Sequence, residues 1–451
     1  MEKNIFEKHA VRHLSNGGFV MALNVEAKID GQAEAMLQAL HSRSTGGIES
    51  HLKVLEEKGA ENFMEKFYVG YGHKSIGDCG SVTVFVEGVS MLAAKAIQDW
   101  RLYSGQEAST RYVDFSKQKF LNPAGIAEGE EIMENWRKFY LEAQEPLIVH
   151  LKKQFPKQDN ENQGVYDKAI IARAFDITRS FLPAGATTNL SWRMNFRQFA
   201  DELMLLRHHP LVEIRDIAEK TEEALQEMYP SSFGQERFPH TEAYNKNWMS
   251  KGYYYENDKC QDFTLLYDCV DRKMLSAYEN VLKTRPMKTE LPTAIGECGV
   301  LAYEFLLDFG SFRDLQRHRA VVQRMPLLTR THGFNKWYLE SLPVDLHEKA
   351  EEFINLQAKR IEKLNIKKEE QQYYNAMGYR VACRLAGDLK AIVYLTELRS
   401  TRFVHATLVE QMLKMIESLK ELFEKDGLAL HLDAEPSRFD IRRGEQDITE
   451  K

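Results

Sequence analysis

The chain has 451 residues, which is long enough for two domains that each bury a core. Its hydrophobic content of 43% and charged content of 28% are typical of a soluble globular protein, and no apolar run approaches the roughly 18 residues of a spanning helix. A net charge of −7 argues against a general surface for binding nucleic acid or anionic membranes. It does not argue against a local basic pocket. Five cysteines without a CxxC pair, and a start without the apolar core of a secretion signal, predict a cytoplasmic location.

The first half is predicted to combine helices with a short sheet. Within Val82 to Val89, the residues Val82, Val84 and Val86 alternate with Thr83, Phe85 and Glu87, and this period of two predicts a strand. Ser90 is predicted to cap the helix that follows, whose apolar residues share one face. Further helices are predicted over 48–68, 129–153, 165–181, 197–207 and 211–228, and an extended segment over 187–194.

The second half is predicted to repeat this order after an aromatic-rich, non-periodic linker. Helices are expected over 270–283, 345–364 and 368–386, with a helix through Arg319 and another to Phe423, and extended segments over 301–307 and 391–395. The predicted division is a first copy (1–235), a linker (236–262), a second copy (263–426) and a charged, poorly ordered tail (427–451). The expected class is α+β, with helices around a small sheet in each of two tandem domains.

The two halves carry the same short motif before the predicted strand. Ile76-Gly77-Asp78-Cys79-Gly80 in the first half corresponds to Ile295-Gly296-Glu297-Cys298-Gly299 in the second. After the next helix the copies differ: the first has Asp99-Trp100-Arg101 and then Gln106, Glu107, Ser109 and Arg111, whereas the second has Arg317-His318-Arg319 and then Arg324, Met325, Leu327 and Thr329. Complementary losses of this kind are expected when one composite site needs only one of each part.

The Arg317-His318-Arg319 tripeptide is a candidate anion or cofactor contact. Two guanidinium groups with an imidazole between them can bind a phosphate or the polar edge of a flavin ring. The alternative is a positively charged last turn that complements the helix dipole. The adjacent His208 and His209 point apart on a helix, so no metal site is predicted.

The polar loop after the first copy's helix is a candidate nucleotide contact. Glu107, Ser109 and Arg111 alternate along it and would present an acceptor, a hydroxyl and a cation on one side. Such a set suits a nucleotide, although a solvated polar loop is the commoner case. Cys79 and Cys298 have no base beside them and are predicted to be packed thiols.

Taken together, these residues resemble the flavin-dependent thymidylate synthases. That family has a Gly-His-x-[Ser/Thr]-x-x-Glu-His turn, an Arg-His-Arg followed by Glu-x-Ser-x-Arg-Tyr, and an Arg-x-x-Leu-Pro followed by Asn-x-Arg. The first copy has Gly72 to Cys79, then Asp99 to Arg101 with Glu107 to Tyr112, then Arg179 to Pro183 with Asn195 to Arg197. The second copy matches through Arg317-His318-Arg319, and through Glu397-Leu398-Arg399 where Asn-x-Arg would fall.

The resemblance implies an enzyme whose sites form between chains. In that family FAD and dUMP contact the Arg-His-Arg of one subunit and the Glu-x-Ser-x-Arg of another, so this double-length chain would form a homodimer that acts as a pseudo-tetramer. The implied reaction is FAD-dependent C5 methylation of dUMP to dTMP, with methylene tetrahydrofolate and NADPH as co-substrates. The alternatives are C5 modification of another pyrimidine nucleotide, or a catalytically silent nucleotide-binding or scaffold protein.

The resemblance also implies a role for each matching residue. Arg207 would be catalytic and polarise the uracil edge. The nucleotide would contact Gln106, Glu107, Ser109, Arg111 and Arg179, and the cofactor would contact His73, Ser75, Asp78, Asn195, Arg197, Arg317, His318 and Arg319.

Overall fold

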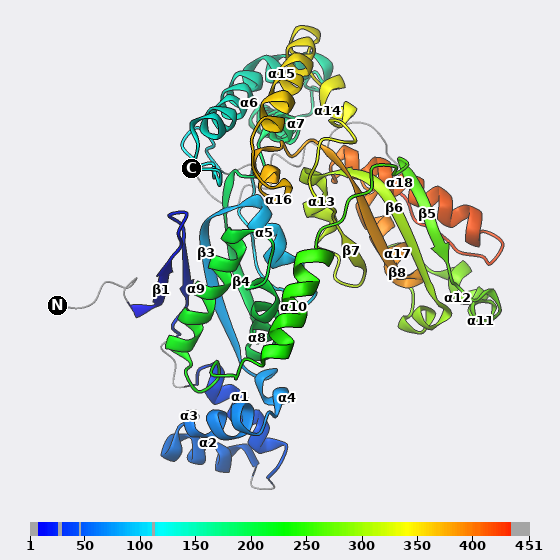
Figure 1. Ribbon diagram of the computed structural model, residues 1–451. Coiled ribbons are helices and arrows are strands. Elements are labelled where there is room, and N and C mark those ends of the chain that lie inside the picture. Colours follow the sequence, from blue (N-terminus) through cyan, green and yellow to red (C-terminus); the bar gives the residue numbers. More distant parts are fainter. Residues whose placement is uncertain (1–7, 26–28, 45–46, 111–112, 434–451) are drawn as a thin grey trace. The chain divides into compact units, whose positions relative to one another are not determined.

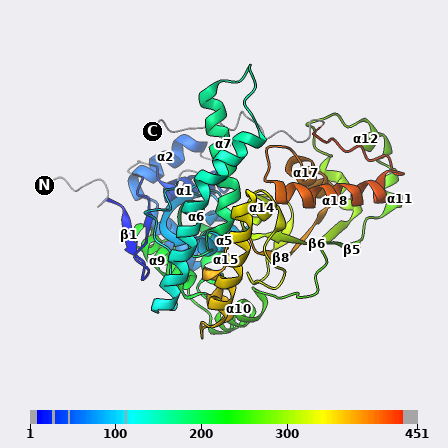
Figure 2. The same cartoon turned by 90° about the horizontal axis from the view of Figure 1, so that it is seen from above.

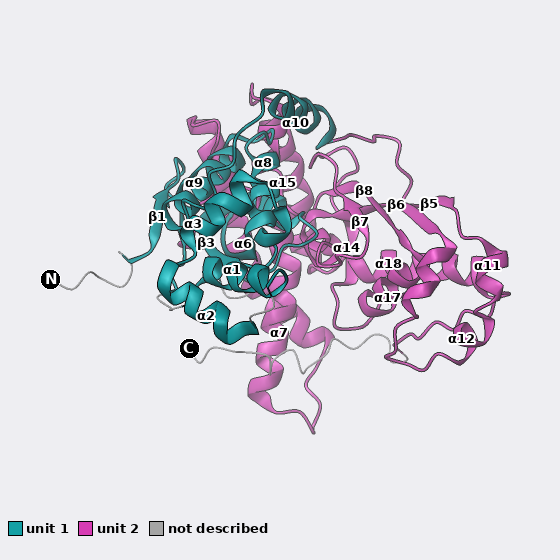
Figure 3. Cartoon of the chain, turned by 90° about the horizontal axis from the view of Figure 1, so that it is seen from below, with its two compact units in different colours: residues 1–113, 186–254 teal, residues 114–185, 255–451 magenta. Residues whose placement is uncertain are grey.

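The computed structural model describes residues 8–25, 29–44, 47–110 and 113–433 (Figure 1). Internal contacts divide the chain into two compact units: unit 1 is residues 1–113 and 186–254, and unit 2 is residues 114–185 and 255–451 (Figure 3). Each unit contains one antiparallel four-stranded sheet together with helices, which confirms the predicted α+β class. No helix in these described ranges is long and apolar enough to cross a bilayer.

The sheet of unit 1 has the order β1-β2-β3-β4. Its strands are β1 (Ala10–His13), β2 (Phe19–Ala22), β3 (Ser81–Ser90) and β4 (Thr187–Asn195). Val82, Val84 and Val86 of β3 are buried while their neighbours are partly exposed, so the period of two predicted for this segment is confirmed. Ser90 ends the strand and caps the next helix, because its side chain accepts a hydrogen bond from the Ala93 amide.

Helices pack on this sheet and at one end of it. They are α1 (Gly31–His41), α2 (Gly47–Lys58), α3 (Glu61–Phe63), the π-helix η2 (Met64–Gly70), α4 (Lys74–Gly77), α5 (Met91–Gln98), α8 (Phe196–Leu206), α9 (Val212–Met228) and α10 (Pro239–Gly252). Helix α9 packs on β1 and β2, and α5 and α8 contact β4. Helices α1 to α4 gather at the end of the sheet where β3 begins (Figure 1).

The sheet of unit 2 has the order β5-β6-β8-β7 and a more deeply buried centre. Its strands are β5 (Phe263–Asp268), β6 (Val300–Asp308), β7 (Val322–Arg324) and β8 (Arg380–Asp388). Every residue of β6 after Val300 is buried, so this central strand is covered on both faces. Helix α18 (Ala406–Phe423) covers one face, where it buries Met412, Met415 and Ile416.

The helices of unit 2 come from both halves of the chain. They are α6 (Ala127–Gln154), α7 (Gln163–Thr178), η3 (Arg179–Phe181), α11 (Arg272–Ser276), α12 (Glu279–Thr284), η4 (Thr293–Cys298), α13 (Phe309–Leu315), α14 (Lys336–Glu340), α15 (Val344–Glu362), α16 (Lys368–Gln371), η5 (Gln372–Tyr374), α17 (Leu389–Arg399) and α18. The long helices α6 and α15 lie side by side (Figure 2), and Phe139 stacks on Phe353 with ring centroids 4.6 Å apart.

Matching segments of the two units have the same local construction. β4 and α8 contain 9 and 11 residues, and so do β8 and α17. Asn195 caps α8 and Asp388 caps α17, each by accepting a hydrogen bond from the amide three residues later. β3 is likewise followed by α5 with the cap Ser90, and β6 by α13 with the cap Asp308. The repeated order therefore extends to the capping residues.

Two predictions for the second half are wrong. The expected helix over 368–386 contains instead the short turns α16 and η5 and most of β8, and the expected extended segment over 391–395 lies inside α17. Ala, Arg and Leu in β8 are good helix formers, but pairing with β6 decides the outcome. In α17 the β-branched pair Ile392-Val393 suggested a strand, whereas the Asp388 cap begins a helix.

Other boundaries also differ from the prediction. The linker contains the helix α10, which buries only Asn245 and Met249 and so lacks an apolar stripe in the sequence. The helix expected over 270–283 is divided into α11 and α12, that expected over 48–68 into α2, α3 and η2, and α13 ends at Leu315, before Arg319. Residues 114–185 belong to unit 2, so the compact units mix the halves, and the predicted division into copies stays a prediction about the repeat. Most of the predicted tail lies outside the described residues.

Candidate functional site

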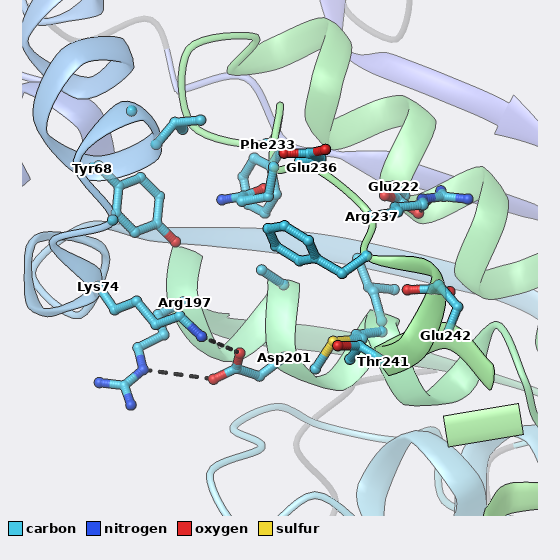
Figure 4. Close-up of a pocket in the computed structure, with 18 of the residues that line it drawn as sticks. Tyr68, Lys74, Arg197, Asp201, Glu222, Phe233, Glu236, Arg237, Thr241 and Glu242 are labelled. Carbon is cyan, nitrogen blue, oxygen red and sulfur yellow. Dashed lines mark hydrogen bonds and ion pairs between the residues drawn. The ribbon is translucent and has the colours of Figure 1, made fainter. Parts of the chain in front are cut away.

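Unit 1 contains a cavity of about 560 Å³ beside helix α8 (Figure 4). Its walls come from η2 and the residues that follow it, from α8, and from the segment 233–242, which includes the first turn of α10. The lining includes aromatic side chains (Tyr68, Tyr71, Phe233, Phe238), cations (Lys74, Arg197, Arg207, Arg237) and carboxylates (Asp201, Glu222, Glu236, Glu242). This size lies within the range of small-molecule sites, and the charged groups that line it are balanced in number.

One wall of the cavity unites two predicted cofactor residues. Arg197 Nη1 lies 2.9 Å from Asp78 Oδ2, and Arg197 Nε lies 3.6 Å from Asp201 Oδ2. Lys74 Nζ lies 4.0 Å from the other oxygen of Asp201 (Figure 4). The hydrogen bond that Arg197 donates to Asp78 raises the pKa of Arg197, so its guanidinium stays cationic. Asp78 and Arg197 are far apart in the sequence, and the fold brings them into contact.

The other residues of these two motifs are placed differently. His73 and Ser75 are exposed beside the cavity-lining Lys74 and are not part of the cavity wall. Asn195 uses its side-chain oxygen to accept a hydrogen bond of 2.9 Å from the Gln198 amide. This bond makes Asn195 a helix cap, which is a structural role that the sequence motif did not indicate.

Tyr68 is a cavity residue that the sequence did not single out. It is buried on η2, and burial raises its pKa well above the usual range for tyrosine. Gly77 allows this placement, because a Cβ atom there would lie 2.4 Å from the Tyr68 ring. No signal in the sequence distinguished Tyr68 from the other aromatic residues of the segment 63–71.

Arg207, the predicted catalytic residue, reaches the cavity but is already paired. Its Nε donates to Glu242 Oε2 at 2.9 Å, its Nη2 contacts the other oxygen, and Glu222 lies 3.7 Å from Nη1. His208 Nε2 lies 2.8 Å from the same Glu242 carboxylate. The Arg207 guanidinium lowers the pKa of Glu242 to about 2, so the carboxylate is ionised at any ordinary pH.

The predicted nucleotide loop lies along the edge of the unit 1 sheet. Ser104 pairs with Arg193 and Glu107 with Leu190, as β7 pairs with β8 in unit 2. The Glu107 carboxylate accepts a hydrogen bond of 2.8 Å from the Gln98 side chain. The backbone N–H of Gln106 donates to Ser191 Oγ at 3.0 Å. Gln106 and Ser109 are exposed, while Arg111 lies outside the described residues. Contacts with β4 and with Gln98 therefore fix the part of the loop that contains Gln106 and Glu107.

The Arg317-His318-Arg319 tripeptide follows α13 in unit 2. Arg317 and Arg319 are exposed, whereas His318 is buried. Arg399 Nε donates to His318 Nε2 at 2.6 Å. Burial and the neighbouring Arg399 lower the pKa of His318 to about 4, so the imidazole is neutral near pH 7.

Arg179, a predicted phosphate contact, also belongs to unit 2. It lies in η3, in the electrostatic neighbourhood of Asp176, Asp308 and Asp314. Burial lowers the pKa of Arg179, but these acidic neighbours outweigh burial and raise it. Burial raises the pKa of Asp314, but Arg179, Arg317 and Arg399 outweigh burial, and the pKa is lowered overall. Three guanidinium groups therefore act on one carboxylate.

Arg399, at the end of α17, also belongs to this cluster around Asp314. The prediction matched Glu397-Leu398-Arg399 to Asn-x-Arg, and this match is wrong. Because Asp388 caps α17 as Asn195 caps α8, the matching position is Asp388 to Lys390 at the start of the helix. Glu397 is engaged instead by Arg285, whose Nη1 donates to it at 3.0 Å. Recognising the Asp388 cap would have corrected the register.

The matching position in unit 1 carries an acidic and an aromatic residue in place of Arg317 and His318. Counted from the caps Ser90 and Asp308, Asp99 corresponds to Arg317 and Trp100 to His318. Asp99 accepts hydrogen bonds from Lys95 Nζ at 2.6 Å and from Tyr253 Oη at 2.7 Å. Trp100 Nε1 donates to Gln198 at 2.8 Å. In unit 1 the polar groups of Asp99 and Trp100 are thus engaged by other residues of the same unit.

The described residues contain no group of three or more His, Cys, Asp and Glu side chains suited to a metal. All five cysteines are free thiols. Burial raises the pKa of Cys79 and of Cys298, which makes both poorer nucleophiles than an exposed thiol.

Comparisons with known proteins place the match in the first half of the chain. Residues 25–231 match the family model described as thymidylate synthase complementing protein. A flavin-dependent thymidylate synthase of Pyrococcus furiosus is 27% identical over 172 residues, which cover 36% of this chain and 63% of that protein.

Longer matches cover most of the chain. A UPF0159 protein of Chlamydia muridarum is 25% identical over 402 residues, which cover 76% of this chain and 75% of the relative. A UPF0159 protein of Thermoplasma acidophilum is 25% identical over 443 residues, which cover 81% of this chain and 87% of the relative. The predicted resemblance to the flavin-dependent thymidylate synthases, in a chain of double length, is thereby confirmed.

Proposed function

We propose that this chain is an FAD-dependent enzyme that methylates C5 of a pyrimidine nucleotide, most simply dUMP to dTMP. Methylene tetrahydrofolate would supply the carbon and NADPH the reducing equivalents. The family model over residues 25–231 and the similarity to enzymes named flavin-dependent thymidylate synthases support a role in thymidylate synthesis.

One observation carries the proposal: the two units differ at the position after α5 and α13. In unit 2, Arg317 and His318 lie in a cluster with Arg179 and Arg399. In unit 1, Asp99 and Trp100 are satisfied by internal hydrogen bonds. Unit 2 therefore offers an anionic ligand several guanidinium groups together, whereas unit 1 has an acid and an indole in place of Arg317 and His318, as a composite site with complementary losses requires.

The residues present fit a flavin. The cavity of about 560 Å³ offers aromatic walls at Tyr68 and Phe233 and polar groups at Arg197 and Asp201. In the proposed site Asp78, Arg197 and the Arg317-His318-Arg319 group hold the cofactor, with His73, Ser75 and Asn195 beside them. When bound and reduced, the flavin would supply the hydride for the transfer.

The nucleotide would be held by the loop and by guanidinium groups. Gln106, Glu107, Ser109 and Arg111 would bind the base, sugar and phosphate, and Arg179 would add charge at the phosphate. Arg207 would polarise the uracil edge, because a fixed cation beside a developing anion stabilises the transition state. We further propose that the loop of one chain and the Arg-His-Arg of a second chain form each site, in a homodimer.

The visible absorption spectrum tests this function directly. The full-length protein is titrated with FAD and the flavin band is followed, first alone and then with dUMP. We expect a bound-flavin spectrum that shifts when dUMP is added, because both ligands share one site. A protein that leaves the spectrum of FAD unchanged contradicts the proposal.

A silent nucleotide-binding or scaffold role is the second candidate, and the pairing of Arg207 with Glu242 and Glu222 favours it. Turnover separates the two. Release of methylated product from dUMP supports the enzyme, whereas nucleotide binding without turnover supports the silent protein. Parallel assays with UMP and dCMP identify the pyrimidine if dUMP is not the substrate.

A further inference from the structure

Helix α10 connects the two predicted copies and supplies the partner of Arg207. We propose that Arg207 and His208 form an anion site that α10 keeps closed, with Glu242 as the group that an incoming anion displaces. This inference concerns regulation of the proposed site. It rests on the proposed function only for the identity of the anion.

The contact has the geometry of anion recognition. Arg207 Nε and Nη2 address the two oxygens of Glu242, and His208 Nε2 lies 2.8 Å from one of them. A guanidinium fork binds a carboxylate and a phosphate through the same pair of N–H groups. Glu242 therefore occupies the position that an anionic ligand of Arg207 would take.

The charges show what happens when Glu242 leaves. Arg207 and Arg237 face the carboxylates Glu222 and Glu242, so this group of four is neutral. Glu222 lies 2.6 Å from Arg237 but 3.7 Å from Arg207. Without Glu242 the group is left with one net positive charge, and Arg207 is the cation with the weaker remaining partner.

The site opens onto a space that can take a ligand. Glu242 and Thr241 line one side of the cavity, and Lys74 and Arg197 lie on the opposite side (Figure 4). An anion bound at Arg207 would therefore lie beside the cavity proposed for the cofactor. Closure by α10 would control both the charge of this wall and the access to Arg207.

Helix α10 is held by little apolar burial. Only Asn245 and Met249 of its residues are buried, while Tyr244 is 69% exposed and Trp248 is 46% exposed. Its first turn has no side-chain cap, and residues 229–238 and 253–262 on either side form neither helix nor strand. A segment of this kind opens at lower free energy than the core, and polar contacts such as Glu242 with Arg207 set that energy.

Two variants of the full-length chain test the proposal, with inorganic pyrophosphate as the probe anion. In Glu242→Gln we expect pyrophosphate to bind roughly tenfold more tightly than in the wild type, which corresponds to the loss of one competing charged contact. Amides of α10 should exchange hydrogen faster in this variant. The control is Glu236→Gln, the same chemical change at another carboxylate that lines the same cavity. It should change neither readout appreciably.

Adding Arg207→Leu to Glu242→Gln should abolish the gain in pyrophosphate affinity. If Glu242→Gln leaves either the affinity or the exchange of α10 unchanged, or if the gain survives the loss of Arg207, the proposal is wrong. Should Glu242→Gln fail to fold, Glu242→Asp serves instead, because its shorter side chain keeps the charge but cannot reach the fork in the same way. Neither readout needs flavin or turnover, so a failure of the proposed reaction leaves this test intact.

Discussion

Arg399 donates a hydrogen bond from Nε to Nε2 of His318 at 2.6 Å. Because arginine carries only donors, Nε2 of His318 must be the acceptor, and a proton on this imidazole must be on Nδ1. Arg399 thus sets the tautomer of the histidine in the Arg317-His318-Arg319 group. It is a positioning residue at the end of α17 that acts through His318.

Replacing Arg399 should change the titration of His318. In Arg399→Leu we expect the pKa of His318 to rise from about 4, because one of the two leading causes of its depression is removed while burial remains. An NMR titration of the imidazole signals measures the change. Arg360→Leu, which removes a partly exposed arginine paired with Glu131, is the control. A His318 pKa that is the same in Arg399→Leu and in the wild type contradicts the assignment.

The stability of the protein should fall as the pH drops from about 6.5 to about 4. Burial and the nearby Arg179 lower the pKa of His405 to about 4, and His318 has a similarly depressed pKa. As the pH falls, the histidines of the unfolded chain are protonated before those of the folded protein. The two histidines therefore contribute their full stabilisation above the unfolded pKa, and this contribution is lost as the pH falls to the folded pKa. Each histidine contributes on the order of 3 kcal/mol at about 1.4 kcal/mol per pKa unit.

Urea unfolding at a series of pH values measures this loss. His405→Gln removes one titrating group from the core, where His405 contacts Ser311 and Thr407. Its stability should therefore depend less steeply on pH than that of the wild type. An equally steep dependence in this variant would show that other groups are responsible.

Arg111→Ala and Arg319→Ala should each abolish turnover if the proposed site takes one part from each chain. A mixture of the two inactive variants should recover about one quarter of the wild-type activity, because half of the dimers are mixed and one of their two sites carries neither change. Turnover of the separate and mixed, co-refolded variants is the measurement. Full activity in either single variant, or no recovery on mixing, argues against the composite site.

Asn195→Ala should lower the free energy of unfolding by about 1 kcal/mol, because the cap of α8 is lost. Asn195→Ser keeps a capping oxygen and should stay close to the wild type. Urea denaturation compares the three proteins. FAD affinity in Asn195→Ser then tests the proposed cofactor contact without loss of the cap. An Asn195→Ala variant as stable as the wild type contradicts the capping role.

Glu202→Leu should stabilise unit 1 near pH 7 by about 1–3 kcal/mol. Glu202 is 2% exposed, its two carboxylate oxygens have no hydrogen-bond partner among the described residues, and burial raises its pKa well above the usual value. The matching residue in α17 is Leu395, which is fully buried. The gain should shrink at low pH, because the unfolded chain then also holds the Glu202 proton and folding no longer requires proton uptake. Thermal unfolding of both proteins at two pH values measures it.

The sequence by itself determined the local features of this protein. The alternation in Val82–Val89 predicted β3, Ser90 predicted the start of α5, and the repeated motif predicted a repeated strand and helix, because each depends on neighbouring residues. The motifs also identified Asp78, Arg197 and Arg207 as candidate site residues, and these lie at or beside one cavity. Their partners were not predictable in this way.

Only the tertiary structure decided which groups meet. Pairing with β6 made residues 380–388 a strand in spite of their helix-forming composition, and a helix in the expected linker brought Glu242 to Arg207. The same long-range folding placed Arg179 in unit 2 and brought Arg399 to His318. These contacts join residues that are far apart in the sequence. Their energies come from burial and charge pairing that no local pattern encodes.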